Sequence, residues 1–201
     1  MNPIITVGRQ FGAGGREIGK KLAETLGIPY YDKELLAEAA HISGLCKEYL
    51  EQKDENSTNS LMYSLVMGTQ TLTGYPSLEE LTQKAYRDAV ESVSGQGGCV
   101  IVGRSADYIL KGNPRLLRVF LSASEDFRIQ RVCKRDNLSP KEAAVKLHRM
   151  DRTRSAYYHT MTGQKWGNAE NYDLCVHVSR FGTPKTLQMI LDAAKNLEIT
   201  Q

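Results

Sequence analysis

The chain has 201 residues, 41% hydrophobic and 24% charged, a composition typical of a globular protein with one buried core and room for a small inserted lobe. Its formal net charge of +3 suits anionic small molecules but is too small to predict nucleic-acid binding. The sequence contains no apolar run long enough for a membrane and does not start like a signal peptide, so we expect a cytoplasmic protein without membrane contact.

Five short apolar runs rich in β-branched residues predict strands, at residues 4–7, 28–31, 99–102, 117–121 and 174–178. Most of these runs are continuous, which is typical of parallel strands covered on both faces. Ile18, Leu22 and Leu26 repeat at four-residue spacing and predict a helix after the first strand. Strands that alternate with helices predict an α/β protein with a parallel sheet.

Several helices have recognisable start signals. Capping boxes begin at Ser77 and at Ser139, and Pro140 then occupies the first helical position. Thr183 and Pro184 predict the start of a last helix. The four cysteines are scattered and predict reduced thiols, with Cys99 and Cys175 as apolar filler of strands.

Two long segments interrupt the alternation within what we expect to be a single domain, 1–201. Residues 37–98 contain no strand-like run, although the spacing of Leu78, Leu81, Ala85 and Ala89 predicts a helix there. Residues 122–172 are densely basic. We expect both segments to close over a substrate, because phosphoryl transfer to water must be prevented.

The stretch GRQFGAGGRE, residues 8–17, places four glycines between the first strand and the first helix. Such a turn directs backbone N–H groups at phosphates, and the following helix adds its positive end. We therefore predict a phosphate-binding loop at Gly8, Arg9, Gly12, Ala13, Gly14, Gly15, Arg16 and Glu17. A glycine-rich turn without a ligand is the plainer alternative.

Two departures from known phosphate loops stand out in this turn. The P-loop pattern expects Lys and then Ser or Thr where this chain has Gly15 and Arg16. A dinucleotide fingerprint is the rival pattern, since Asp32 lies about twenty residues on, where a ribose-binding acid would be. However, Glu17 stands where that fingerprint needs a third glycine, so the rival is weaker.

With these residues in view, the chain resembles the cytidylate kinase-like family, a branch of the P-loop nucleoside monophosphate kinases. The resemblance rests on GRQFGAGGREIG at 8–19, IPYYDKELL at 28–36, IVGRSADYIL at 101–110, VFLSASEDFRIQR at 119–131, DRTRSAYY at 151–158 and WGNAENYDL at 166–174. It implies a three-layer P-loop NTPase fold: a five-stranded parallel sheet with helices on both faces, a helical nucleotide-monophosphate-binding insertion and a basic lid. It also implies transfer of the ATP γ-phosphate to CMP, dCMP or a related acceptor, with ATP and Mg²⁺ as cofactors and nucleotides as partners.

The resemblance also implies residue roles. It places Asp32, Arg104, Asp107, Asp151 and Arg154 at the acceptor. Each has a plainer alternative: Arg104 in a surface ion pair with Asp107, Asp32 as the cap of a helix at Lys33, and Asp151 with Arg154 as an ordinary helical ion pair. The lid would add catalytic arginines at Arg128, Arg131 and Arg135, with Arg16 in the loop.

Loss of the P-loop lysine and hydroxyl leaves the chemistry open. Arg9 and Arg16 bracket the loop and could supply the missing charge. No residue is assigned as a dedicated metal ligand, although Mg²⁺ could fall to Asp32 or Asp107. The expected enzyme is a cytidylate-directed kinase. The alternatives are a non-catalytic nucleotide-binding module of the same fold and a kinase of another small molecule.

Overall fold

The computed structural model describes residues 2–32 and 78–197. The chain divides into two compact units, one made of Met1–Asp32 and Val93–Gln201 and the other of Lys33–Ser92. Most of helix α5 (Leu78–Gly95) belongs to the second unit, and this helix confirms the one predicted from apolar spacing. The rest of the predicted insertion, and the cap predicted at Ser77, lie outside the described residues.

The first unit contains a five-stranded parallel sheet, which confirms the predicted fold class. In chain order the strands are β1 (Ile4–Arg9), β2 (Tyr30–Tyr31), β3 (Cys99–Val102), β4 (Leu116–Ser122) and β5 (Leu174–His177). Their spatial order is β2-β3-β1-β4-β5. Ile4 of the central strand lies opposite Cys99 on one side and Leu116 on the other. The carboxyl end of β1, where the glycine turn begins, is therefore flanked by the ends of β3 and β4.

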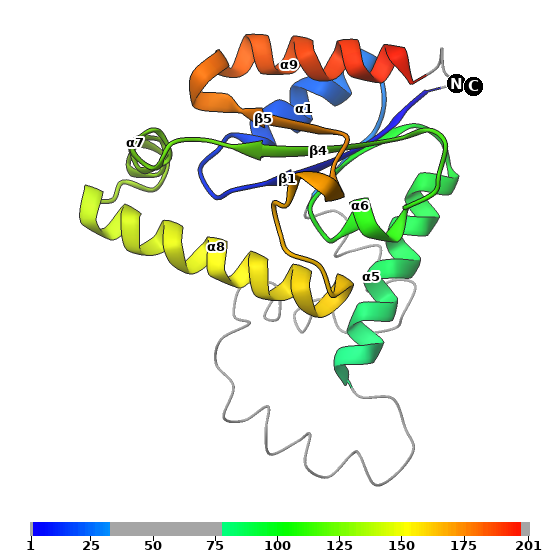
Figure 1. The fold of residues 1–201 in the computed structure, drawn as a ribbon, viewed down its shortest axis with the longest axis horizontal. Coiled ribbons are helices and arrows are strands. Elements are labelled where there is room, and N and C mark those ends of the chain that lie inside the picture. Colours follow the sequence, from blue (N-terminus) through cyan, green and yellow to red (C-terminus); the bar gives the residue numbers. More distant parts are fainter. Residues whose placement is uncertain (1, 33–77, 198–201) are drawn as a thin grey trace, which may run out of the picture. The chain divides into compact units, whose positions relative to one another are not determined.

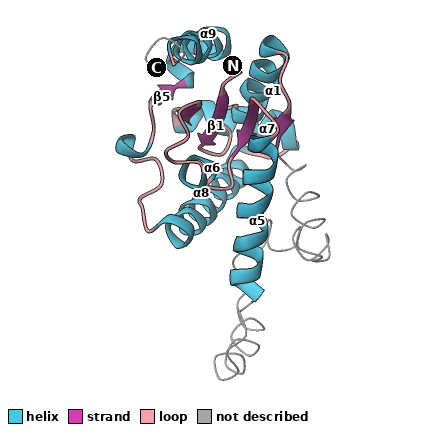
Figure 2. Ribbon diagram, turned by 90° about the vertical axis from the view of Figure 1, so that its right-hand side faces the viewer, coloured by secondary structure: helices cyan, strands magenta, loops and turns pink. Residues whose placement is uncertain are grey.

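Helices cover both faces of the sheet (Figure 1). One face carries α1 (Gly15–Leu26) and α9 (Val178–Asn196), and the other carries α6 (Ala106–Ile109) and α8 (Pro140–Thr162). Helix α7 (Glu125–Asp136) follows β4 and packs against α8, and a 3-10 turn, η1 (Ala169–Asn171), precedes β5. The same arrangement of layers is visible after a quarter turn in Figure 2. These are the three layers expected of the fold.

The main core lies between the sheet and the α1–α9 layer. Fully buried aliphatic side chains of the strands, such as Val7 and Val119, pack there against Ile18 and Leu22 of α1 and Ile190 of α9. The predicted stripe on α1 is thus confirmed. Glycine is needed on the opposite face, because a Cβ at Gly8 would lie 2.9 Å from the ring of Phe120.

The structure also confirms the predicted starts of two helices, α8 and the last helix, α9. The Ser139 side chain accepts a hydrogen bond from the Glu142 N–H, and the Glu142 carboxylate accepts one from the Ser139 N–H, so the predicted capping box forms. Pro184 follows a break at Gly182, where φ is 74°, and the helical part beyond it confirms the predicted last helix. The expectation for Cys175 was wrong: it is exposed, because β5 is an edge strand.

Among the described residues, we find no helix whose length and apolar character would let it span a membrane.

Candidate phosphate-binding site

The glycine turn connects β1 to α1 at the carboxyl edge of the sheet. Gly12 and Gly14 adopt φ values of 81° and 92°, in the left-handed region where a side chain would be strained. A Cβ at Gly12 would also lie 3.0 Å from the Cβ of Arg128, so α7 approaches the turn closely. Ala13 between the two glycines is fully buried. The turn therefore needs small residues for both its conformation and its packing.

The backbone donors of the turn point to an anion. Within the described residues, the N–H groups of Gly14, Gly15, Arg16 and Glu17 have no hydrogen-bond acceptor. The first bonded donor is the Ile18 N–H, 3.0 Å from the Gly14 carbonyl. No side chain caps the helix at Gly14. Four unused donors at the positive end of a helix are suited to bind phosphate oxygens.

Asp32 connects the end of β2 to this turn. Its carboxylate is buried, with Arg16 Nε at 2.5 Å from Oδ2 and Arg9 Nη2 at 3.6 Å from Oδ1. The predicted site residues Arg9, Arg16 and Asp32 are thus brought together. The alternative role of Asp32, as the cap of a helix at Lys33, falls outside the described residues.

Asp151 and Arg154 on α8 hold the backbone of the turn. Asp151 Oδ1 accepts a hydrogen bond of 2.7 Å from the Phe11 N–H, while its Oδ2 lies 2.5 Å from Arg128 Nη1. Arg154 donates from Nη1 to the carbonyl of Arg9 at 3.1 Å. Helix α8 is thereby joined to residues 9–11 through two polar contacts. The spacing of three residues places both side chains on the same face of α8, as predicted.

The electrostatics around Arg154 favour an anion. Burial, and then the nearby charge of Arg9, lower the pKa of Arg154 to about 9. Its one hydrogen bond within the described residues is to a neutral carbonyl. The pKa of Arg9 is also lowered, first by burial, while Asp32 opposes this effect and Arg104 and Arg16 add to it. Arg9 and Arg154, two buried guanidinium groups with lowered pKa values, therefore gain stability when a negative ligand binds.

The three arginines of α7 predicted to be catalytic are all engaged. Arg128 is buried and paired with Asp151. Arg131 lies 2.8 Å from Glu17 and is the main cause of the lowered pKa of that carboxylate. Arg135 pairs with Asp136. The Arg131 pair joins α7 to the start of α1 and the Arg128 pair joins it to α8, so the predicted lid helix lies against the turn.

Phe11 is a site residue that the sequence analysis missed. Its ring is buried in a small cluster with Val132 of α7 and Leu147 of α8. The guanidinium groups of Arg135 and Arg154 lie 4.7 and 5.3 Å from its centre, at cation–π distance. A large aromatic residue inside a glycine-rich turn was the available signal, because such a side chain needs a partner surface.

Arg104 follows β3 in an unusual backbone conformation. Gly103, Arg104 and Ser105 have φ values of 84°, 61° and 51°, which is a strained run for two residues that carry side chains. Arg104 directly follows Gly103, which lies against the Arg9 guanidinium, and the charge of Arg104 helps to lower the pKa of Arg9. Strain of this kind is concentrated at binding and catalytic sites.

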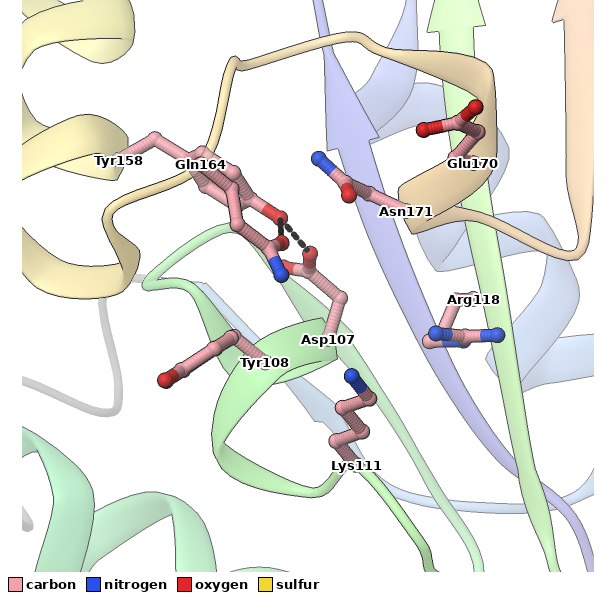
Figure 3. Close-up of a pocket in the computed structure, with 8 residues that line it drawn as sticks. All are labelled: Asp107, Tyr108, Lys111, Arg118, Tyr158, Gln164, Glu170 and Asn171. Carbon is pink, nitrogen blue, oxygen red and sulfur yellow. Dashed lines mark hydrogen bonds between the residues drawn. The ribbon is translucent and has the colours of Figure 1, made fainter.

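Asp107 lies in a different environment from Arg104. It is buried and accepts a hydrogen bond of 2.7 Å from the Tyr158 hydroxyl. Burial raises the pKa of the Asp107 carboxyl, and Tyr158 and Arg118 partly oppose this rise. Together with Gln164, these residues line a cavity of about 30 Å³, roughly the room of one water molecule (Figure 3). The structure does not bring Asp107 into the arginine cluster, and Tyr158 and Arg118 were not foreseen as its neighbours.

Known proteins resemble this chain over most of its length. The profile of the cytidylate kinase-like family matches residues 4–180. The chain belongs to this family. One relative is the cytidylate kinase of Methanopyrus kandleri, 22% identical over 94% of this chain and 92% of that protein. An uncharacterised protein from Eubacterium ventriosum has a similar structure, with a TM-score of 0.72 and 26% identity over 96% of this chain and 99% of that one.

More distant structures share the fold alone. Shikimate kinase from Acinetobacter baumannii superposes with a TM-score of 0.53 at 15% identity, covering 98% of this chain and 94% of that one. As a member of the cytidylate kinase-like family with the P-loop kinase fold, the chain is a phosphotransferase.

Proposed function

We propose that this cytidylate kinase-like protein transfers the γ-phosphoryl group of ATP to CMP, dCMP or a related acceptor. The observation that carries the proposal is the gathering of Arg9, Arg16 and Arg154 at the turn whose N–H groups, from Gly14 to Glu17, have no acceptor among the described residues. Arg104 directly follows Gly103, which lies against the Arg9 guanidinium. Among the described residues, Asp32 is the carboxylate that pairs with members of this cluster. Arg9 and Arg16 share the carboxylate of Asp32, and Arg154 donates to a neutral carbonyl, an arrangement that favours a negatively charged ligand.

In this reaction the protein forms no covalent bond to the substrates. An oxygen of the acceptor phosphate forms a bond to the γ-phosphorus as the bond from that phosphorus to the β–γ bridging oxygen breaks, and ADP leaves with the electron pair. Charge spreads over the transferring oxygens, so catalysis consists of positioning and electrostatic stabilisation. In the proposal, the N–H groups of Gly14 to Glu17 hold the donor phosphates, while Arg104 and Arg154 hold the acceptor phosphate.

The described carboxylates do not form a dedicated magnesium site. Asp32 lies between two guanidinium groups, and Asp107 is buried against Tyr158. Glu17, near the place where the P-loop pattern has a hydroxyl, contacts Arg131 and Lys21. We propose that Mg²⁺ arrives with the nucleotide and is held by phosphate oxygens and water, as is common for this ion.

The α7 arginines divide into two roles in this proposal. Arg128 is a positioning residue, because its buried pair with Asp151 fixes the turn. Arg131 and Arg135 are partly exposed, and the Arg131 partner Glu17 is a partly exposed carboxylate whose pairing contributes little stability. Asp136 pairs with Lys146 as well as with Arg135, so it keeps a cationic partner when Arg135 turns away. The side chains of Arg131 and Arg135 can exchange partners and reach a bound phosphate.

The acceptor is proposed from the relatives named cytidylate kinase together with Arg104, Asp151 and Arg154. A coupled assay with ATP, Mg²⁺ and a panel of CMP, dCMP, UMP, AMP and GMP tests it. We expect turnover on CMP or dCMP, and we expect Arg104→Ala to lower kcat/KM by about 100-fold, the effect of losing one charged phosphate ligand. Arg152→Ala, an exposed arginine on α8, is the matched control and should match the wild type.

Other outcomes would change the assignment. Turnover confined to a non-nucleotide acceptor would overturn the nucleotide assignment and leave a small-molecule kinase. A folded protein that binds ATP yet turns over none of the acceptors would contradict the proposed reaction.

A further inference from the structure

The side chain of Arg9 fills the space that belongs to position 15. A Cβ built on Gly15 would lie 2.7 Å from Arg9 Cγ, 2.9 Å from its Cβ and 3.3 Å from its Cδ. Real Cβ atoms essentially never lie within 3.0 Å of a neighbouring heavy atom, and the near end of the Arg9 side chain cannot easily move away. Position 15 is where the P-loop pattern has its lysine. In this chain the stem of that lysine and the stem of Arg9 would occupy the same volume.

The guanidinium end of the Arg9 side chain lies beside Gly103 and Asp32. A Cβ at Gly103 would collide with Arg9 Nη1, so a second glycine, distant in sequence, leaves room for the guanidinium. Its contact with Asp32 is an ion pair at 3.6 Å, and within the described residues the guanidinium donates no hydrogen bond. The side chain is only 15% exposed. The Arg9 side chain therefore runs from Gly15 to Gly103, and within the described part of the chain its guanidinium N–H groups donate no hydrogen bond.

We propose that Arg9 performs the task of the P-loop lysine, through an exchange in which a glycine–lysine pair at positions 9 and 15 is replaced by an arginine–glycine pair. This inference rests on the proposed function. The guanidinium lies between the glycine turn and the Asp32 side of the site, so it contacts the phosphoryl group in transfer. A guanidinium can bind two oxygens of that group at once, which an ammonium cannot. Arg16 is the weaker candidate, because its side chain is 55% exposed and bonded to Asp32.

The steric conflict between Arg9 and a side chain at position 15 can be tested without an activity assay. The variants are Gly15→Ala, Arg9→Gly and the double variant, each compared by melting temperature. Gly15 has no positive φ, so alanine meets no backbone penalty there. We expect Gly15→Ala to lower the melting temperature in the wild type and to cost little or nothing in the Arg9→Gly background. An equal loss in both backgrounds would show that Arg9 does not fill this space and would overturn the exchange.

The role of Arg9 in phosphoryl transfer is tested by measuring kcat, KM and ATP affinity of the variants. We expect Arg9→Ala to lower kcat by about 100-fold to 1,000-fold with a smaller change in KM, since its contact strengthens in the transition state. Arg9→Lys should lose less, because the charge stays and only the two-point contact is lost. The double variant Arg9→Gly with Gly15→Lys should recover at least about tenfold of the activity lost in Arg9→Gly. Arg152→Ala should behave as the wild type.

The outcomes separate this inference from the proposed function. A wild type that turns over with an equally active Arg9→Ala variant would overturn the role of Arg9 and leave the kinase intact. If the double variant Arg9→Gly with Gly15→Lys has neither a higher kcat nor a higher ATP affinity than Arg9→Gly, the proposed exchange is overturned. A wild type without turnover and without ATP binding would refute the proposed function and the role of Arg9 with it, whereas the melting-temperature cycle would still report the packing. Should Arg9→Gly not fold, Arg9→Ala and Arg9→Lys supply the comparison.

Discussion

Asp151 connects two parts of the site through its two carboxylate oxygens. One oxygen accepts from the Phe11 N–H in the glycine turn, and the other pairs with Arg128 on α7. Arg128 in turn lies near the Phe11 carbonyl, 3.4 Å from Nη1. A single helical carboxylate therefore fixes the turn and the lid helix relative to each other.

We expect Asp151→Asn to destabilise the fold by about 3 kcal/mol, because it leaves the charge of buried Arg128 without a partner. Urea unfolding, followed by circular dichroism, measures this loss. Glu24→Gln removes the same charge from an exposed position on α1 and should change the free energy of unfolding by less than about 0.5 kcal/mol. Similar losses in the two variants would contradict the positioning role of Asp151.

At the scale of single residues, the sequence predicted which residue types gather but not how they pair. Arg128, Arg131 and Arg135 share a basic stripe, yet Arg128 is buried and Arg135 is half exposed. Which member of a stripe turns inward depends on how α7 meets the glycine turn, and spacing alone does not carry that information. The path of Arg9 past Gly15 was unpredictable for the same reason, because it depends on how the turn meets Asp32 and Gly103, which are distant in sequence.

Strands and helices were predicted more closely than side-chain contacts. The predicted strand 99–102 has the same bounds as β3, because all four of its residues are buried and give a continuous apolar run. The run 28–31 shrank to Tyr30–Tyr31. Pro29 has no N–H to donate, and its carbonyl accepts from the Val100 N–H just before the regular ladder begins. Elements whose burial is set by the local sequence were predictable, while their exact ends depended on neighbouring strands.

The junction of α6 and α8 makes a pH-dependent contribution to stability. Burial raises the pKa of the Asp107 carboxyl, so the folded protein binds this proton more tightly than the unfolded chain does. Stability from this group is therefore lost as pH rises from the ordinary carboxyl pKa, near 4, through the raised value in the folded state. Asp107→Asn removes the ionisation, and its amide oxygen can still accept from Tyr158.

We expect the free energy of unfolding of the wild type, relative to that of Asp107→Asn, to decrease between pH 4 and pH 7. Urea unfolding at several pH values measures this difference. Asp126→Asn, at an exposed carboxylate in the first turn of α7, should give a flat difference over the same range. A flat difference for Asp107→Asn as well would show that the buried carboxyl does not carry the pH dependence.

The molecule as a whole bears only a mild positive charge, so its affinity for phosphate depends on where the charge lies. Net charge is +3 over 201 residues, but Arg9 lies close enough to Arg16, Arg104 and Arg154 at one edge of the sheet for their charges to interact. A small net charge can therefore coexist with a strong local site for anions. Composition gives the net charge of the chain but not where the charged side chains gather in the fold.

We expect pyrophosphate to raise the melting temperature of the wild type, because it binds the folded site and not the unfolded chain. At a concentration 100 times its dissociation constant, the gain would be about 2.7 kcal/mol. Arg154→Ala should reduce this gain, and Arg152→Ala should preserve it. Differential scanning fluorimetry at fixed ionic strength measures the shift. An undiminished gain in Arg154→Ala would place the anion elsewhere.

The crowding of Arg9 against Gly15 has a consequence for the order in which substitutions can accumulate. A long side chain at position 15 collides with Arg9 while Arg9 is present. On the role proposed for Arg9, its loss before a lysine appears leaves the loop without a cation. Any stepwise route between the two loop types passes through one of these handicapped intermediates. The two positions therefore form an epistatic pair, and the effect of a substitution at either one reverses with the identity of the other.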